Sequence, residues 1–366
     1  MNLKINILDR YIIKRFIGTY FFAILIFIVI VIIFDISEKI DKFVDKGAGF
    51  EAIVVNYYAN FIPYFMNMFS PLFVFISVIF FTSKLAHHTE IVAILAGGIS
   101  FKRLLYPYFI SAAIIAFFSL FLSLFVIPPA NKTRLEFTDR YIKDRYINTN
   151  RNIHFQLSPG NYVYMESFNS INNVASKFTL ETIEGHNLVS KLSAETAIWD
   201  TTFNGWKLYN YYIRNSDVNA PNSHQVIERG YQRDTIINLS VNDLNRRDNF
   251  VESFNYRELN ELIKTQKMRG DKRVMYAQIE KHTRFSLPFS AFILTLIGVS
   301  LSAKKRKGGI GLNIGIGLVL SFSYILFLRF SQMFVHAGVL PPFIALWVPN
   351  ILYSFIAIIL YRIAPK

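Results

Sequence analysis

The sequence predicts a polytopic α-helical membrane protein with six transmembrane helices in a 3+3 layout and an inserted antiparallel domain of the β-jellyroll type. Two observations predict this class. Hydrophobic residues make up 52% of the 366 residues and mean hydropathy is +0.32 despite a formal charge of +14, so hydrocarbon is the expected solvent for much of the chain. In addition, a polar stretch, residues 132–284, separates two groups of three apolar runs.

The apolar runs each approach the roughly 20 residues that a membrane helix needs. Pro63 and Pro71 predict that the second helix begins near Pro63 or is kinked, and Pro128-Pro129 are expected to close the third. The first run is too long for a cleaved signal peptide and lacks a cleavage site. The six runs are Phe16–Phe34, one within Ala52–Ser83, one within Leu104–Ile127, Phe285–Ala303, Gly308–Leu328 and one from about Pro342 to before Arg362.

The distribution of charge predicts the orientation of these spans. Residues 1–15, 84–103, 304–307 and 362–366 together hold 13 Lys and Arg against two acids, Asp9 and Glu90. The short loops 35–51 and 329–341 hold four basic and five acidic residues. Because cytoplasmic loops carry the excess of Lys and Arg, both termini are expected in the cytoplasm and residues of about 132–284 outside it.

The polar stretch alternates with period two, which is typical of strands. Ser158-Pro159-Gly160-Asn161 predicts a turn between His154–Leu157 and Tyr162–Glu166. Asn204-Gly205 predicts a hairpin that joins Trp199–Phe203 to Trp206–Ile213. Further strand candidates are Lys177–Ile183, Leu188–Leu192 and Ala194–Trp199. Such repeated short strands favour an antiparallel sandwich or roll, whose open face could hold an apolar ligand or whose edge could pair with another β protein.

The period changes after about residue 250, where Tyr256, Leu259, Leu262 and Ile263 fit an amphipathic helix that ends near Gly270. The predicted organisation is therefore residues 1–131 for helices one to three, 132–270 for the β-domain with its C-terminal helix, and 271–366 for helices four to six.

The cytoplasmic segment of about residues 84–100 contains a short predicted helix. Thr89 is placed to cap it, Glu90 lies in its first turn where the helix dipole favours a carboxylate, and Gly97-Gly98 ends it. Two interpretations stay open: an interfacial helix with a capping Glu, or a helix that docks a cytoplasmic motor. The adjacent His87 and His88 lack the i, i+4 spacing of a metalloprotease helix, so a membrane-surface position is favoured over a metal site.

Two further segments have simple membrane explanations. Lys304-Lys305-Arg306-Lys307 is a short turn between two spans, and positive-inside topology accounts for it without nucleic acid. The glycines that follow lack the ending of a phosphate-binding loop. Gly311 and Gly315 instead form a small-xxx-small pair that favours close helix packing.

Charged residues gather at the outer end of the first span. Lys39, Lys42 and Lys46 lie at i, i+3 and i+7, each preceded by an acid. Local ion pairing on a solvated face and a basic strip for anionic lipid headgroups both remain open, and Arg134 and Arg329 are placed to join such a strip. The sequence contains no catalytic constellation, no metal-ligand pattern, no cofactor motif and no nucleotide-binding motif, so ATP-driven work would need a separate ATPase.

Several motifs give the chain a family resemblance. Leu8-Asp9-Arg10-Tyr11-Ile12 and Lys42-Phe43-Val44-Asp45 flank the first span, and Glu90 to Ser100 combines a Glu, an apolar helix and Gly98 followed by a Ser. Together with Arg284-Phe-Ser-Leu-Pro288-Phe289 and Trp347-Val-Pro349-Asn350, these resemble the permease subunits of the lipopolysaccharide-export ABC transporter, the LptF/LptG family. The N-terminal motif is similar to the G-type subunit, although Asp35 stands where that subunit carries a basic residue.

The resemblance implies a concrete function. Two such permeases of the bacterial inner membrane pair, a cytoplasmic ATPase dimer drives them, and lipopolysaccharide leaves through a gate that includes spans one and five. The periplasmic β-jellyroll passes the lipid to β-jellyroll bridge proteins. By this analogy the ATPase-coupling residues are Glu90, Ile91, Ile94, Gly98 and Ser100, and Lys39, Lys42 and Arg134 are lipid-binding candidates. Lys46 and Arg329 join these candidates because of their positions at the outer ends of spans one and five.

Two other functional classes remain as alternatives. A non-transporting membrane scaffold or sensor would use the outer domain to bind a periplasmic protein and would purify without an ATPase. A lipid-modifying membrane enzyme is less well supported, because the sequence offers no acid/base or metal cluster for it.

Overall fold

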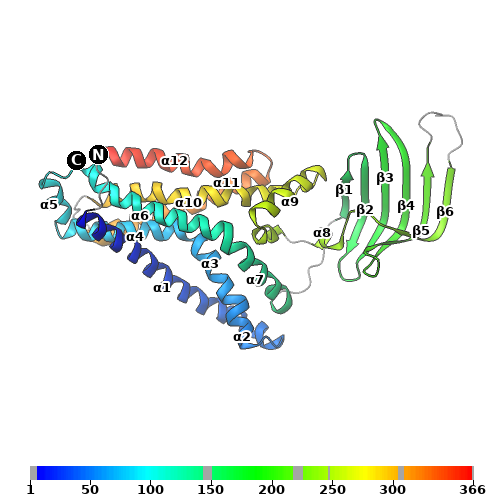
Figure 1. Ribbon diagram of the computed structural model, residues 1–366, viewed down its shortest axis with the longest axis horizontal. Coiled ribbons are helices and arrows are strands. Elements are labelled where there is room, and N and C mark those ends of the chain that lie inside the picture. Colours follow the sequence, from blue (N-terminus) through cyan, green and yellow to red (C-terminus); the bar gives the residue numbers. More distant parts are fainter. Residues whose placement is uncertain (1–5, 143–150, 217–225, 246–247, 304–308, 365–366) are drawn as a thin grey trace. The chain divides into compact units, whose positions relative to one another are not determined.

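A computed structural model describes residues 6–142, 151–216, 226–245, 248–303 and 309–364 (Figure 1). The chain divides into two compact units. Unit 1 comprises Met1–Ile142, Val251–Tyr256 and Met275–Lys366, and unit 2 comprises Lys143–Phe250 and Arg257–Val274. The predicted basic turn Lys304–Lys307 lies outside the described residues.

Unit 1 is helical, and six of the helical segments that the structure describes are long and apolar enough to cross a membrane. This confirms the predicted six-span class. Its helices in chain order are α1 (Ile7–Asp45), α2 (Phe50–Ala52), α3 (Ala59–Met68), α4 (Ser70–His87), α5 (Glu90–Ala96), α6 (Phe101–Phe121), α7 (Ile127–Tyr141), α10 (Val274–Ser302), α11 (Gly309–His336) and α12 (Pro342–Ile363), with π-helical turns at η1 (Ile53–Tyr58) and η2 (Leu122–Val126).

The second apolar run is interrupted beside Pro71, as the kinked alternative expects, but not at Pro63. Pro63 lies inside α3, and the second span starts only at Ser70, after Phe69 leaves helical geometry with φ −93° and ψ 1°. Pro71 then occupies the first turn of α4, where a missing N–H costs nothing.

Pro128 and Pro129 do not close the third span, contrary to the prediction. The helix continues through the π-helical turn η2 into α7, and both prolines lie in the first turn of α7. A π-helical turn shifts the hydrogen-bond partners by one residue, so the chain passes two prolines without ending the helix.

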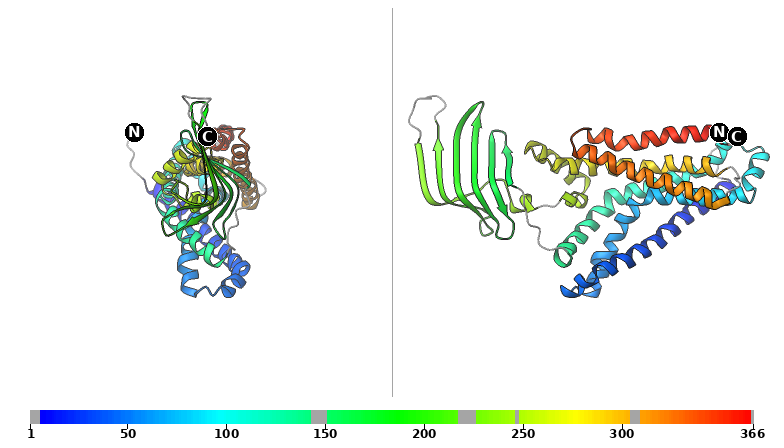
Figure 2. Two further views of the ribbon diagram at one scale, coloured as in Figure 1. Left: turned by 90° about the vertical axis from the view of Figure 1, so that its right-hand side faces the viewer. Right: turned by 180° about the vertical axis from the view of Figure 1, so that it is seen from behind.

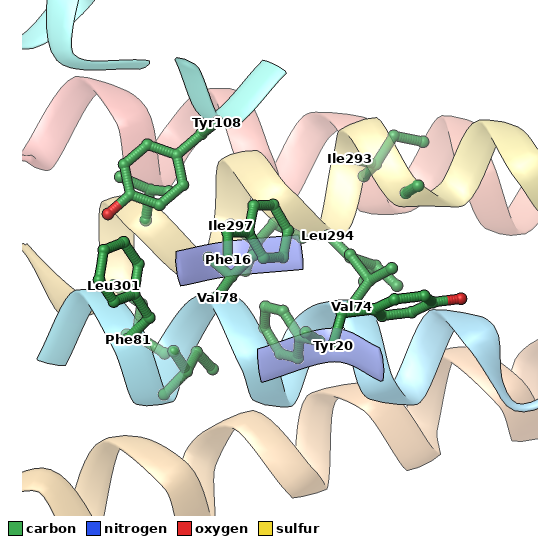
Figure 3. Packing of buried hydrophobic residues seen from close by; sticks show 14 of the residues in the cluster. Phe16, Tyr20, Val74, Val78, Phe81, Tyr108, Ile293, Leu294, Ile297 and Leu301 are labelled. Atoms are coloured by element: carbon green, nitrogen blue, oxygen red, sulfur yellow. The ribbon is translucent and has the colours of Figure 1, made fainter. Parts of the chain in front are cut away.

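Helices α4 and α10 form the centre of unit 1. Phe16 and Tyr20 of α1 reach Val74 and Val78 of α4, and Ile297 of α10 completes the contact (Figure 3). Figures 1 and 2 show α1 diverging from α12 toward its C-terminal end, so much of α1 lies at the margin of the bundle.

Glycine contacts bring α10 and α11 against α4, but at other positions than the sequence suggests. A Cβ added at Gly298 would lie 2.7 Å from Val78 Cγ1, and one at Gly317 would lie 2.3 Å from Ile79 Cδ1. Gly311 and Gly315 have open space around them within the chain. Among the described residues, the predicted small-xxx-small pair therefore makes no close helix contact.

Unit 2 contains one antiparallel six-stranded sheet in the order β1-β2-β3-β4-β5-β6 (Figure 1). This confirms the inserted antiparallel β-domain, and the described strands form an up-and-down meander. The strands are β1 (Arg151–Ser158), β2 (Asn161–Asn169), β3 (Val174–Glu184), β4 (Asn187–Asp200), β5 (Gly205–Asn215) and β6 (Val226–Thr235); the helical segments α8 (Val241–Asn245), η3 (Asp248–Ser253) and α9 (Tyr256–Met268) follow.

One face of this sheet is a packed apolar core. Phe178 and Trp206 are fully buried, and Leu239 and Leu244 from the segment after β6 pack against them. The indole N–H of Trp206 donates to the carbonyl of Leu239 at 2.9 Å, which fixes this covering segment on the apolar face. The expected open apolar face is thus filled, and the polar face remains accessible.

Candidate functional site

The predicted coupling segment forms α5, a two-turn helix at the end of unit 1 that also holds both described chain ends (Figure 1). Ile91 is fully buried, and Ile94 packs partly buried on the same core. Val92, Ala93 and Ala96 are exposed, so α5 presents a narrow apolar surface with small side chains. Ile91 and Ile94 therefore position the helix, while these three side chains face away from the core.

The ends of α5 differ in part from the sequence expectation. Thr89 does not cap the helix: its φ is +60° and its hydroxyl donates to the carbonyl of His88 at 2.6 Å. Glu90 lies half-buried in the first turn. Gly98 has φ +86°, and its N–H donates to the carbonyl of Leu95 at 3.1 Å, so the helix ends as predicted in a left-handed residue.

Ser100 caps the next helix. Its hydroxyl accepts from the backbone N–H of Arg103 at 3.3 Å, which starts α6 directly after the coupling segment. His87 and His88 are exposed and their rings meet at 5.5 Å. Among the described residues, no group of three His, Asp or Glu is arranged to hold a metal ion.

An ion pair that the sequence did not predict ties the start of α6 to the start of α1. The guanidinium of Arg103 donates to both carboxylate oxygens of Asp9, at 2.7 and 2.6 Å, and the Asp9 side chain is only 1% exposed. Asp9 also accepts the N–H of Asn6 at 2.9 Å, which completes the N-terminal cap of α1. The pair joins α1 to α6 beside the coupling segment. The only sequence signal for it was an acid within a strongly basic segment.

The opposite end of α1 carries the predicted basic strip. Lys39 is paired with Asp35 and donates to the hydroxyl of Tyr57 at 2.7 Å, while Tyr58 donates to Asp35 at 3.0 Å. The ammonium group of Lys39 therefore has its partners within the chain. Asp35 is its counter-ion.

The other lysines of the strip face outward. Lys42 and Lys46 are exposed, and Phe43 between them is buried against Tyr57 and Phe137. In the described part of the chain, the ammonium group of Lys42 has no carboxylate partner. Of the three lysines in the predicted strip, Lys39 is therefore paired within the chain, whereas Lys42 and Lys46 face outward.

Arg134 belongs to a second charged cluster, which is centred on Glu252 of η3. Glu252 accepts from the Tyr64 hydroxyl at 3.0 Å and from the Asn131 amide at 3.4 Å, and its carboxylate lies 3.9 Å from the Arg134 guanidinium. The Arg134 guanidinium also lies 5.1 Å above the ring of Tyr64. These contacts fix residues 251–256 on α3 and α7.

The electrostatics of this cluster raise the pKa of its central acid. Burial, followed by the negative charge of Glu280, raises the pKa of Glu252 to about 7, although Tyr64, Arg134 and Arg329 favour its ionised form. Glu280 itself pairs with Arg284 at 2.7 Å. Sequence reasoning missed Glu252, because it lies in the polar insert and far along the chain from every contact partner.

Arg329 differs from Arg134 in its exposure. Its guanidinium is exposed and donates to Gln332 at 3.1 Å and to the Met68 sulfur at 3.3 Å, both uncharged acceptors. Among the predicted lipid-binding side chains, Lys42 and Arg329 therefore combine exposure with a charge that no direct carboxylate contact in the described residues offsets.

Comparison with known proteins gives one family. The model of the lipopolysaccharide export system permease LptF/LptG matches residues 10–363. No curated protein sequence matches the chain. The match covers nearly the whole chain, including both helical halves and the β-domain between them, and it does not separate the F-type from the G-type subunit.

Proposed function

Because the chain belongs to the LptF/LptG family of lipopolysaccharide export permeases, we propose that it is the transmembrane permease subunit of an ABC transporter. It is a multi-pass protein of the inner membrane and the membrane component of a transporter rather than an enzyme. In the proposed complex, a second permease of the same family and a cytoplasmic ATPase dimer complete the transporter. The observation that carries this proposal is the family match over residues 10–363.

The proposed orientation follows from charge. The end of unit 1 with α5 and both termini faces the cytoplasm, because the short segments there carry the excess of Lys and Arg. Unit 2 then lies in the periplasm, where it passes lipopolysaccharide to a β-jellyroll bridge protein.

ATPase coupling is assigned to α5. The exposed Val92, Ala93 and Ala96 have little side-chain bulk, so a groove of the ATPase can approach the helix backbone closely. Glu90 supplies a charge at the helix start, and the buried Ile91 fixes the helix on the bundle. Gly98 and Ser100 end α5 and start α6, so they set its direction.

Co-purification from native membranes tests the complex and the coupling site together. Wild-type protein is expected to bring down an ATPase and a second six-span permease. Ala93→Arg and Glu90→Lys should lose the ATPase while the second permease stays bound. The matched control is Glu51→Lys, an equivalent charge change on an exposed acid of α2.

If wild-type protein purified without an ATPase, or if export survived in Ala93→Arg and Glu90→Lys, the permease proposal would fail. The chain would then act as a scaffold or sensor whose outer domain binds a periplasmic protein.

Lipid phosphates are assigned to Lys42, Lys46 and Arg329, with Arg134 and Lys39 in supporting positions. Lys39 engages a phosphate only when Asp35 moves aside, because Asp35 and Tyr57 already hold its ammonium group. Lys42→Ala should weaken stimulation of the ATPase by added lipopolysaccharide, and Lys39→Ala should do so less. Equal stimulation in wild type and Lys42→Ala would refute this assignment.

A further inference from the structure

The polar face of the β-sheet in unit 2 carries an ordered array of side chains. Strand register aligns His154, Tyr164 and Thr179 in one row across β1, β2 and β3. The neighbouring row aligns Tyr162 with Glu181 and Glu181 with Lys191 across β2, β3 and β4. Because alternate residues of a strand share a face, both rows lie on the side opposite the buried core.

A hollow lies between these two rows. It has a volume of about 290 Å³, and its lining includes all six of these side chains. This volume is at the lower end of the range for small-molecule sites. It suits one compact ring and is too small for a bundle of acyl chains.

The aromatic part of the lining is partly exposed. The rings of His154 and Tyr164 lie 4.7 Å apart, and the Tyr164 hydroxyl donates to Asn152 at 3.0 Å. Tyr162 is 38% exposed, and within the described residues its hydroxyl makes no hydrogen bond. Three aromatic rings on adjacent strands therefore line the hollow, and the exposed Tyr162 ring can pack against an apolar C–H surface beside the His154–Tyr164 ring pair.

The charged part of the lining is balanced. Lys191 donates to Glu181 at 2.7 Å, and both side chains are about one-third exposed. A carboxylate accepts hydrogen bonds and an ammonium group donates them, so together they match a ligand with several hydroxyl groups. A phosphate or other compact anion would meet the Glu181 charge, and an acyl chain would leave the pair unsatisfied.

We propose that this hollow binds a saccharide ring, with the sugar's C–H face on Tyr162 and Tyr164 and its hydroxyl groups on Glu181, Lys191 and Thr179. A sugar ring combines an apolar face with a polar edge, which is the combination that the two rows present. Two sources share this chemistry: the oligosaccharide portion of lipopolysaccharide and the amino-sugar chains of the cell wall. The geometric argument does not depend on the permease function.

Glycan binding to the full-length protein in detergent tests the proposal. The two probes are delipidated core oligosaccharide from lipopolysaccharide and an N-acetylglucosamine disaccharide, and saturation-transfer NMR and calorimetry report binding. Tyr162→Ala and Tyr164→Ala should weaken binding about tenfold, since each removes a stacking face. Tyr164→Phe keeps the ring and should bind nearly as wild type.

Tyr212→Ala is the matched control. Tyr212 is an exposed tyrosine of β5, paired with Ser193 outside the hollow, so its loss should leave binding unchanged. Near-ultraviolet circular dichroism, to which the buried Trp206 contributes, checks that each variant remains folded.

Tighter binding of the core oligosaccharide assigns the site to the exported glycolipid, and tighter binding of the disaccharide assigns it to the cell wall. The proposal is overturned if neither glycan binds at millimolar concentration, or if Tyr162→Ala and Tyr164→Ala bind as wild type does. Loss of ATPase co-purification would contradict the permease function and leave this measurement unaffected.

Discussion

Asp9 shows how much one buried charge depends on its partner. Its carboxylate is almost fully buried and receives two guanidinium hydrogen bonds from Arg103. Removing one partner of a buried ion pair leaves the other charge without compensation. The Arg103 side chain is 36% exposed, so water can partly replace it.

Arg103→Ala is therefore expected to lower the free energy of unfolding by about 2 kcal/mol. Thermal unfolding in detergent measures the change. Lys102→Ala is the control, because this exposed neighbour carries the same charge. The double variant Asp9→Asn/Arg103→Ala should recover much of the loss; if it is no more stable than Arg103→Ala, the pair is not the cause.

Because the pKa of Glu252 is raised, we expect the free energy of unfolding to depend on pH. Its pKa is about 7 in the folded protein and near the ordinary value of 4.5 when unfolded. Between about pH 4.5 and pH 7 the folded state holds a proton that the unfolded chain has lost, so the free energy of unfolding falls as pH rises through this window. The groups that face Glu252 are Tyr64, Asn131, Arg134, Glu280 and Arg329.

Glu252→Gln keeps the side-chain shape and cannot ionise. Wild type should lose stability between about pH 5 and pH 7.5, and the variant should not. The difference in free energy of unfolding between variant and wild type should therefore grow by about 2 kcal/mol, which is less than the full pKa shift would give because solvent screens the charge. Melting temperatures across this range measure the difference. Parallel curves for the two proteins would show that Glu252 does not titrate in this window.

At the scale of elements, the helices follow from the sequence because each has a continuous apolar run of membrane length. Their ends do not follow as directly. Pro128 and Pro129 usually mark a helix end, yet here the π-helical turn before them lets the helix continue to Tyr141. Local sequence favours the stop, and packing of Phe137 against Phe43 and Tyr57 favours the longer helix.

The sequence predicts a series of strands in the β-domain, but it does not predict the long-range contacts made around them. Alternation identified β1, β2, β3 and β5, but it divided β4 into two strands at Ser193 and missed β6. Asn204 does adopt φ +50°, yet the hairpin closes at the Asp200–Gly205 pair, so its loop is Thr201–Asn204 and not the predicted two-residue Asn204-Gly205 turn. The covering of Trp206 by Leu239 and the anchoring of Glu252 join residues that are distant along the chain. Such contacts carry no local periodicity, so a single sequence does not reveal them.

Helix packing around α4 makes a prediction about glycines. Gly298→Ala should destabilise unit 1 by about 1–3 kcal/mol, because the new methyl group meets the stiff, branched side chain of Val78. Gly315→Ala meets open space and should be neutral or stabilising by up to about 1 kcal/mol, since alanine favours helices more than glycine does. Thermal unfolding of the two matched variants decides this; equal losses would contradict the close α10–α4 contact.

At the scale of the whole molecule, burial separates two kinds of helix. In the most apolar 18-residue stretch of each helix, 78% of the residues are buried in α4 and in α10, against 22% in α1 and 28% in α11. Large apolar side chains such as Phe22 and Leu25 of α1 and Val319 of α11 therefore face outward. These two helices leave most of their apolar surface uncovered by the described chain, whereas α4 and α10 form its packed centre.

The proposed orientation leads to a test that this chain is well suited to, because it has no cysteine. A single cysteine replaces either Val92 of α5 or Ile171, which lies between β2 and β3, and both positions are exposed. A membrane-impermeant maleimide that crosses only the outer membrane should label Ile171→Cys in intact cells and Val92→Cys only after the inner membrane is opened. This expectation has a physical basis in charge. Residues 1–15, 84–103, 304–307 and 362–366 carry a net charge of +11, and basic segments resist translocation across the inner membrane. Labelling of Val92→Cys in intact cells, with Ile171→Cys protected, would invert the topology and with it the assignment of α5 to the ATPase.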